Sequence, residues 1–260
     1  METTDSHKAP VASTKKEPGI PVIEIKNLAM GFADQDVIKD LTMQLFEGEN
    51  LVVLGKSGSG KSVLIKCIVR LLFPEAGTIT VLGENVNEMN RKELATLREK
   101  IGFLFQSGAL YDSMTVRENL EFPLRRIKRD LSRKEIDEKV KEVLDNVGLY
   151  ESLDKMPSQL SGGMRKRISL ARTIVVDPLI MLYDEPTTGL DPVTSDEISA
   201  LINEVQKKYK TSSIIITHDI ECARATADRI IMLKDGEVYM EGKPEEFEAS
   251  ADQTIKSFFK

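Results

Sequence analysis

The sequence predicts an α/β fold, in which a largely parallel β-sheet is flanked by helices and carries a helical insertion over roughly residues 106–165. Three observations support this prediction. Short, continuously apolar runs recur along the chain, and such runs suit strands that are buried on both faces of a parallel sheet. A glycine-rich loop joins one of these runs to a helix. Helical patterns dominate the insertion itself.

The composition is that of an ordinary globular protein. The chain has 260 residues, of which 41% are hydrophobic and 30% are charged. Its formal net charge of -6 argues against a protein that coats nucleic acid, so we expect no nucleic-acid partner. We expect residues 1–20, which are polar and have no apolar signal segment, to be a disordered tail before a domain over 21–260. No later apolar run is long enough to cross a bilayer, so we expect a cytoplasmic protein.

Strand patterns dominate the first part of that domain. The predicted elements are antiparallel strands over residues 22–30 and 37–49, a buried parallel strand over 51–55, a helix over 63–72 and a strand over 79–86. Leu64, Cys67, Ile68 and Leu71 share one face of the predicted helix. Cys67 and Cys222 lie far apart and lack the spacing of metal ligands, so we expect both to be reduced core residues.

The remaining elements follow from caps and turns. Two capping boxes, Asn90 with Glu93 and Ser132 with Glu135, each begin a charged helix. The elements predicted here are helices over 91–100 and 132–148, apolar strands over 179–183 and 213–217, a helix that starts at Asp191-Pro192, and a hairpin over 230–242 that turns at Asp235-Gly236.

The strongest local motif is GKSGSGKS, which matches the pattern G-x-x-x-x-G-K-[ST] between a buried strand and a helix. In that context small residues let backbone N–H groups surround the α- and β-phosphates of a nucleotide. Lys61 would neutralise the β- and γ-phosphates, and the Ser62 hydroxyl would offer Mg²⁺ an oxygen ligand. A merely tight turn would not explain Lys61. The predicted phosphate loop consists of Gly55, Lys56, Ser57, Gly58, Ser59, Gly60, Lys61 and Ser62.

Two other strand ends carry side chains that suit a magnesium nucleotide. Asp184 follows an apolar strand and could hold the metal, while Glu185 could accept a proton from the attacking water or orient it. His218 follows another apolar strand, where its imidazole could contact the γ-phosphate. Each feature also has a plainer interpretation, because Asp-Glu pairs are often solvated turns and a single histidine is often a surface residue.

A run of cations at residues 165–167 raises a separate question, because it falls in the first turn of a helix that Ser161 precedes. Each cation there opposes the helix dipole by roughly 0.3–1 kcal/mol, whereas an anion would suit both the dipole and the free N–H groups. We therefore predict an anion at Ser161. The alternative is that these cations extend to nearby acidic residues.

Together these motifs resemble the nucleotide-binding subunits of ABC transporters, from about Val22 to the C-terminus. The resemblance implies a P-loop NTPase fold with a RecA-like core, an N-terminal antiparallel β subdomain and a helical subdomain between the Q-loop and the signature. It also implies that ATP and Mg²⁺ are bound. The residues that it matches are the Walker A loop at 55–62, the Q-loop glutamine Gln106, the signature at 160–164, Walker B Asp184 with the catalytic Glu185, the D-loop with Asp191, and the switch histidine His218.

The resemblance implies roles for several of these side chains. Gln106 and His218 would act in catalysis with Glu185, and Ser62, Gln106 and Asp184 would hold the metal. Phe32 falls where the family places an aromatic residue that stacks on adenine, although a phenylalanine between strands is often plain core. The signature departs from the usual LSGGQ at Met164. Its phosphate-binding residues Ser161, Gly162 and Gly163 are unchanged.

In this family two subunits sandwich two ATP molecules head to tail, which implies that the anion at Ser161 is the γ-phosphate bound to a second copy of the chain. Residues 105–125 and the methionine of the signature resemble the ATPase subunits of Mla, or MCE-associated, lipid transporters. That resemblance implies a peripheral protein on the cytoplasmic face of the inner membrane. Its partners would be a membrane permease and a periplasmic MCE lipid-binding protein, and it would drive phospholipid transport across the cell envelope. Another transporter class, or a non-transporting ABC switch in cell division or envelope assembly, would share every motif.

Overall fold

The computed structural model describes residues 19–33 and 35–259, so nearly all of the tail predicted over 1–20 lies outside the described residues. The strands are β1 (Pro21–Phe32), β2 (Gln35–Phe46), β3 (Asn50–Leu54), β4 (Ala76–Val81), β5 (Glu84–Asn85), β6 (Ile101–Leu104), β7 (Ile180–Asp184), β8 (Ser212–Thr217), β9 (Arg229–Lys234) and β10 (Glu237–Gly242). The α-helices are α1 (Lys61–Ile68), α2 (Arg91–Glu99), α3 (Val116–Ile127), α4 (Arg133–Asn146), α5 (Gly162–Ile174), α6 (Pro192–Tyr209), α7 (Ile220–Thr226), α8 (Pro244–Glu248) and α9 (Gln253–Phe258).

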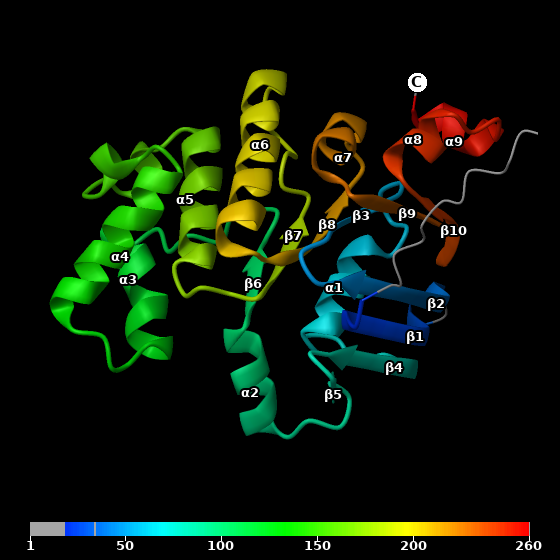
Figure 1. Ribbon diagram of the computed structural model, residues 1–260, viewed down its shortest axis with the longest axis horizontal. Helices are drawn as coiled ribbons and strands as arrows, with labels where there is room; N and C mark the ends of the chain where they lie inside the picture. The colour runs from blue at the N-terminus through cyan, green and yellow to red at the C-terminus, as the bar shows by residue number, and fades with distance from the viewer. Residues whose placement is uncertain (1–18, 34, 260) are drawn as a thin grey trace, which may run out of the picture.

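The central sheet has the strand order β10-β9-β3-β8-β7-β6 in the described part of the chain. Strands β9, β3, β8, β7 and β6 are parallel, and β10 pairs with β9 in the antiparallel direction. Every residue of β3, β7 and β8 is buried, which explains why these strands are apolar without alternation. Because the strands are parallel, the loops that follow β3, β7 and β8 leave the sheet at the same edge (Figure 1).

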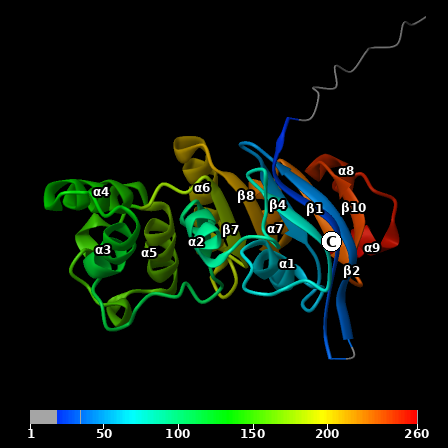
Figure 2. The ribbon, with the colours of Figure 1, turned by 90° about the horizontal axis from the view of Figure 1, so that it is seen from below.

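A second, antiparallel sheet has the order β2-β1-β4-β5. Its inward-facing residues, among them Ile23, Ile25 and Leu41, pack with α1 and one face of the central sheet in a single apolar core. Viewed from below, this sheet lies at the opposite end of the molecule from α3, α4 and α5 (Figure 2).

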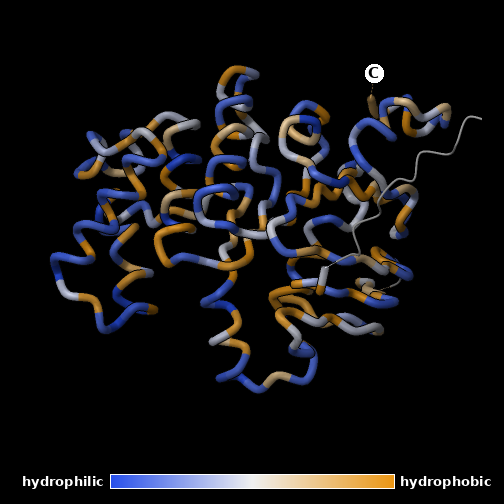
Figure 3. Tube along the Cα trace, in the orientation of Figure 1, coloured by the Kyte–Doolittle hydropathy of each residue, from blue (hydrophilic) through white to orange (hydrophobic). Residues whose placement is uncertain are grey.

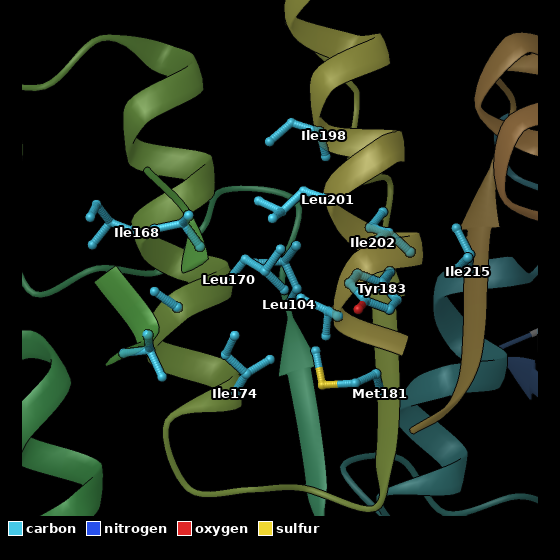
Figure 4. Close-up of a cluster of buried hydrophobic side chains, with 14 of the residues drawn as sticks. Leu104, Ile168, Leu170, Ile174, Met181, Tyr183, Ile198, Leu201, Ile202 and Ile215 are labelled. Carbon is cyan, nitrogen blue, oxygen red and sulfur yellow. The ribbon is translucent and has the colours of Figure 1, made fainter. Parts of the chain in front are cut away.

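The other face of the central sheet is covered by α5, α6 and α7 (Figure 1). Ile168, Leu170 and Ile174 of α5 and Ile198 and Ile202 of α6 meet the sheet in a second apolar core (Figure 4). This core extends into α3 and α4, so the insertion is continuous with the rest of the domain. The helices around the sheets alternate between hydrophilic and hydrophobic positions, as expected when one face packs inward (Figure 3).

The predicted fold is confirmed, including the N-terminal antiparallel sheet and the helices between Gln106 and the signature. Both capping boxes form, at the starts of α2 and α4. The hairpin turns at Asp235-Gly236, where φ is 53° and 85°, respectively, as a two-residue hairpin loop with two left-handed residues requires. Cys67 and Cys222 are buried free thiols, as expected.

Two predicted elements were wrong and one strand was missed. The strand predicted over 79–86 is in fact β4 and β5, which pair in the antiparallel direction across a turn at Leu82-Gly83. The helix predicted over 63–72 starts at Lys61 and ends at Ile68, because Arg70 takes a left-handed φ of 51° that stops it. Leu71 therefore leaves the buried face and is 52% exposed. Strand β6 was not predicted, since its run of only four residues follows a charged helix directly. In the described residues no helix is long and apolar enough to cross a membrane.

Candidate functional site

The phosphate loop, residues 55–62, lies between β3 and α1 at the carboxyl edge of the parallel strands. Gly58 and Gly60 have φ of 82° and 95°, which is the left-handed region that favours glycine. A Cβ on Gly55 would lie 2.6 Å from the Ser59 Oγ and 2.8 Å from the Leu233 carbonyl oxygen. The glycines therefore allow a tight loop whose backbone stands at the start of a helix.

Lys61 points back into this loop. Its Nζ donates hydrogen bonds to the carbonyl oxygens of Gly55 (2.7 Å) and Lys56 (3.0 Å) and lies 3.6 Å from the Glu185 Oε1. Burial lowers the pKa of Lys61, and the charge of Glu185 opposes that effect. The ammonium is thus held between the loop and the carboxylate that follows β7.

Ser62 and Asp184 form a pair of hard oxygen groups. The Ser62 Oγ donates a hydrogen bond to the Asp184 Oδ1 at 3.0 Å, although the two residues are 122 positions apart in sequence. Burial raises the pKa of Asp184, and the hydrogen bond from Ser62 acts in the opposite direction. A hydroxyl and a carboxylate in contact are the kind of protein ligands that Mg²⁺ takes when nucleotide phosphates and waters complete its shell.

Glu185 stands at the centre of the site. It adopts an unusual left-handed φ of 50°, which costs a residue with a Cβ roughly 1–2 kcal/mol, while its N–H still bonds to the Ile216 carbonyl oxygen at 2.9 Å. Its Oε2 lies 2.8 Å from the His218 Nδ1 and accepts a hydrogen bond from the Thr188 Oγ1 at 3.1 Å. The carboxylate is therefore fixed in direction, with half-exposed His218 on its solvent side.

The signature lies elsewhere. Ser161 caps α5, its Oγ accepting a hydrogen bond from the Met164 N–H at 3.2 Å. No hydrogen bond or ion pair among the described residues joins Ser161, Gly162 or Gly163 to the phosphate loop. Both Figure 1 and Figure 2 place strands of the central sheet between α5 and α1.

The cations of α5 have partners in their own chain. Arg165 donates to the Leu160 carbonyl oxygen at 2.8 Å, and Arg167 pairs with Glu197. Lys166 is buried, and its Nζ reaches carbonyl oxygens of residues 106 and 185. Burial lowers the pKa of Lys166 to about 8. Helix α5 begins at Gly162, so Lys166 and Arg167 lie in its second turn, not in its first turn as predicted. Because each cation also has an intrachain partner, these cations are no evidence for an anion at Ser161, and that anion stays a prediction.

Other predicted site residues lie around this centre without joining it. Phe32 ends β1 and is 47% exposed. Asp191 caps α6, accepting a hydrogen bond from the Thr194 N–H at 3.0 Å. The side chain of Gln106 is exposed, and no hydrogen bond within the described residues connects it to Ser62 or Asp184.

Three residues at the site were not predicted from the sequence. Thr188 lies on the turn after Glu185 and holds its carboxylate. Lys166 was interpreted only as part of a run of positive charge. Its position two residues before the apolar Ile168 does not by itself indicate that it is buried. Thr187 donates to the Asp219 Oδ2 at 2.8 Å and so ties the turns after β7 and β8 together.

Comparison with known proteins identifies relatives of the whole domain. Residues 38–188 match the family described as ABC transporter. The chain is 36% identical over 239 residues to the intermembrane phospholipid transport system ATP-binding protein MlaF of Haemophilus influenzae, which covers 92% of this chain and 90% of that protein. It is 40% identical over 249 residues to the probable ribonucleotide transport ATP-binding protein mkl of Mycobacterium bovis, covering 96% of this chain and 69% of that protein.

A solved structure is also similar. The dimeric, post-hydrolysis ATP-binding cassette MJ0796 bound to ADP and Pi aligns with a TM-score of 0.78 at 34% identity, over 85% of this chain and 98% of that one.

Proposed function

This chain belongs to the ABC transporter family as an ATP-binding, ATP-hydrolysing cassette, and we propose that it powers phospholipid transport across a bacterial cell envelope. One observation carries the catalytic part of the proposal: Lys61, the Ser62–Asp184 pair and Glu185 come together at the carboxyl edge of the parallel strands. We take residues 21–260 as one cassette, with 106–165 as its helical subdomain.

The phosphate loop would bind the nucleotide through its backbone N–H groups and the N-terminus of α1. Lys61, now bonded to loop carbonyls, would turn to the β- and γ-phosphates. Ser62 and Asp184 would hold Mg²⁺, which supplies charge neutralisation on the phosphates, and Gln106 would approach from the end of β6. Phe32 would stack on the adenine ring, for which its exposure leaves it available.

Glu185 would orient the attacking water and accept its proton. Its carboxylate is already aimed by Thr188 and His218, so little rearrangement is needed to place a base beside the γ-phosphate. His218, more than half exposed, would contact the γ-phosphate from the solvent side. The left-handed backbone of Glu185 is consistent with a functional role, since strained residues concentrate at such sites.

The signature would complete the site of a second copy of the chain. Ser161, Gly162 and Gly163 stand at the exposed N-terminus of α5, apart from the phosphate loop of their own chain. In a head-to-tail dimer these groups would face the partner's γ-phosphate, and Asp191 would lie at the same interface. The dimeric state named for the MJ0796 structure supports this arrangement.

The cargo is inferred from the MlaF-type resemblance. MlaF of Haemophilus influenzae is named for phospholipid transport and matches this chain over most of both lengths. We therefore propose a membrane permease, docked on residues 107–123, and a periplasmic MCE lipid-binding protein as partners, with the cassette on the cytoplasmic face of the inner membrane. The name of the mkl relative points to a ribonucleotide cargo instead, which keeps another transporter class as the second candidate.

The catalytic proposal is tested by Glu185→Gln, which keeps the shape of the side chain and removes its charge. We expect normal Mg-ATP affinity and a turnover that is lower by about 10²–10⁴-fold. Lys61→Ala should instead lose nucleotide affinity, measured by filter binding. Near-normal turnover of Glu185→Gln would refute the assignment of the base.

The cargo is tested by purifying the tagged chain from detergent-solubilised native membranes. We expect a multi-span permease and an MCE protein to copurify, and phospholipid to stimulate the ATPase activity of that complex. A complex that lacks an MCE protein and responds to ribonucleotides would favour the second candidate. Capture of division or envelope-assembly proteins with no transport activity would favour a non-transporting switch.

A further inference from the structure

Lys166 is a buried lysine in the second turn of α5. Only 5% of its surface is exposed, and it lies five residues after Ser161. Its Nζ donates one hydrogen bond to the Gln106 carbonyl oxygen at 2.8 Å and another to the Glu185 carbonyl oxygen at 3.3 Å. Within the described residues it forms no ion pair.

Burying the Lys166 ammonium costs free energy, and a residue with only a packing role would not carry this cost. A buried ammonium loses most of its hydration. The two carbonyl groups and the charges of Asp184 and Glu185 replace only part of it, since burial still lowers the pKa of Lys166. Leu170, one turn further along the same helix, belongs to the large apolar core. A leucine or methionine would therefore pack here at lower cost, so the lysine indicates a requirement for the two bonds it makes.

The two carbonyl groups belong to different functional segments. Gln106 follows β6 and leads into the proposed permease-docking segment, while Glu185 follows β7 and carries the proposed catalytic base. Lys166 itself belongs to α5, the helix that the signature begins and whose N-terminus would bind the partner's γ-phosphate. One ammonium thus connects three segments that the chemistry must bring into register, and no other side chain among the described residues bonds to both carbonyl groups.

We infer that Lys166 is a positioning residue that transmits the placement of the signature helix to Glu185 and to the segment after Gln106, so that hydrolysis follows closure of the dimer. This inference rests on the proposed function, because it presupposes a signature that acts on the partner's nucleotide. The hydrogen bond from Lys166 to the Glu185 carbonyl oxygen matters because Glu185 has a left-handed φ. A strained backbone returns to a commoner conformation unless its surroundings hold it, and the Lys166 ammonium is one of the groups that bind its carbonyl oxygen.

The test compares full-length Lys166→Met with Lys166→Arg, which keeps a cation that can donate to both carbonyl groups. Lys139→Met is the matched control, because Lys139 is a partly buried lysine on α4 that pairs with Asp177 and Glu142 away from this site. For each variant the Mg-ATP dissociation constant, KM, kcat and melting temperature are measured in the same buffer. Stimulation by the copurified membrane complex is measured as well.

We expect Lys166→Met to keep Mg-ATP affinity within about twofold while kcat falls roughly 10- to 100-fold, since a displacement of a catalytic group by about 1 Å has effects of that size. Lys166→Arg should recover at least half of the wild-type kcat, and Lys139→Met should keep it. A lysine with a merely structural role would not lower kcat while leaving Mg-ATP affinity unchanged, and arginine would not restore its kcat.

Equal kcat in Lys166→Met and wild type would overturn the inference while leaving the proposed function intact. A loss of kcat that tracks the loss of folded protein by melting temperature, or that arginine does not reverse, would also overturn it. Failure of the proposed function would look different, because wild type itself would then show no ATP hydrolysis that depends on Glu185.

Discussion

We predict that removing the hydroxyl group of Tyr183 stabilises the folded protein. Tyr183 lies on β7 and is fully buried in the core against α6, and its hydroxyl has no hydrogen-bond partner among the described residues (Figure 4). Burial also raises the pKa of this phenol, as expected for a group in apolar surroundings. Tyr183→Phe removes the unpartnered oxygen and leaves the ring in place.

The expected magnitude follows from two opposing terms. An unpartnered buried polar group costs about 1–3 kcal/mol, and the phenylalanine no longer bears this cost. Removing one oxygen also forfeits a few dispersion contacts of about 0.1–0.2 kcal/mol each. We therefore expect the free energy of unfolding to rise by about 1 kcal/mol and the melting temperature to rise by about 2–4 °C.

Tyr209→Phe is the control, because its hydroxyl is satisfied. It accepts a hydrogen bond from the Asn146 Nδ2 at 2.6 Å and donates one to the Glu142 Oε1 at 3.3 Å. Its removal should lower the free energy of unfolding by about 1 kcal/mol. Urea unfolding at constant m-value would measure both changes. A destabilised Tyr183→Phe variant, or the same sign for both variants, would refute the reasoning.

Three further predictions concern nucleotide binding, coupling to the permease and packing at the signature. Phe32→Ala should weaken Mg-ATP binding in a filter assay by roughly tenfold, within the 1–3 kcal/mol of base stacking, whereas Phe32→Tyr should bind normally; equal affinity in Phe32→Ala would remove Phe32 from the adenine site. Tyr111→Ala should keep the basal ATPase activity of the isolated subunit and reduce its stimulation by the permease complex, and unimpaired stimulation would contradict docking at this segment. Gly163→Ala should lower the melting temperature more than Gly162→Ala. A Cβ at position 163 would lie 2.6 Å from the Thr194 Cγ2, whereas a Cβ at position 162 would lie 3.7 Å from its nearest neighbour. Calorimetry that shows the reverse order would contradict this packing.

Local signals predicted most of the fold. Capping boxes at Asn90 and Ser132 and the turn at Asp235-Gly236 were predicted because a few adjacent residues determine each of them. The end of α1 was not, since the left-handed turn at Arg70 has no glycine to signal it. Strand β6 was missed because a run of three apolar side chains and one glycine is too short to predict a strand, and it forms one only by pairing with β7.

The site was predictable in its residues but not in its connections. The phosphate loop, Asp184, Glu185 and His218 follow from motifs at strand ends. The contact between Ser62 and Asp184 spans 122 positions and depends on the order of strands in the sheet, which no local pattern contains. The contacts of Lys166 were equally unpredictable from sequence. Its neighbours Arg165 and Arg167 indicate only a run of positive charge, whereas the two acceptors of Lys166 come from the packing of α5 near the ends of β6 and β7.

The central claim is that ATP is hydrolysed at a site shared by two chains, and one mixing experiment tests it most directly. One chain carries Lys61→Ala, which disables its phosphate loop, and the other carries Ser161→Arg, which blocks its signature; melting curves first verify that both are folded. Neither alone should form an ATP-dependent dimer. The mixed dimer contains one intact site, made from Lys61 of the second chain and Ser161 of the first, and nucleotide bound there stabilises closure by mass action. Sedimentation of differently labelled chains should therefore show a heterodimer only with Mg-ATP, whereas its absence under conditions in which the wild-type chain dimerises would contradict the shared site.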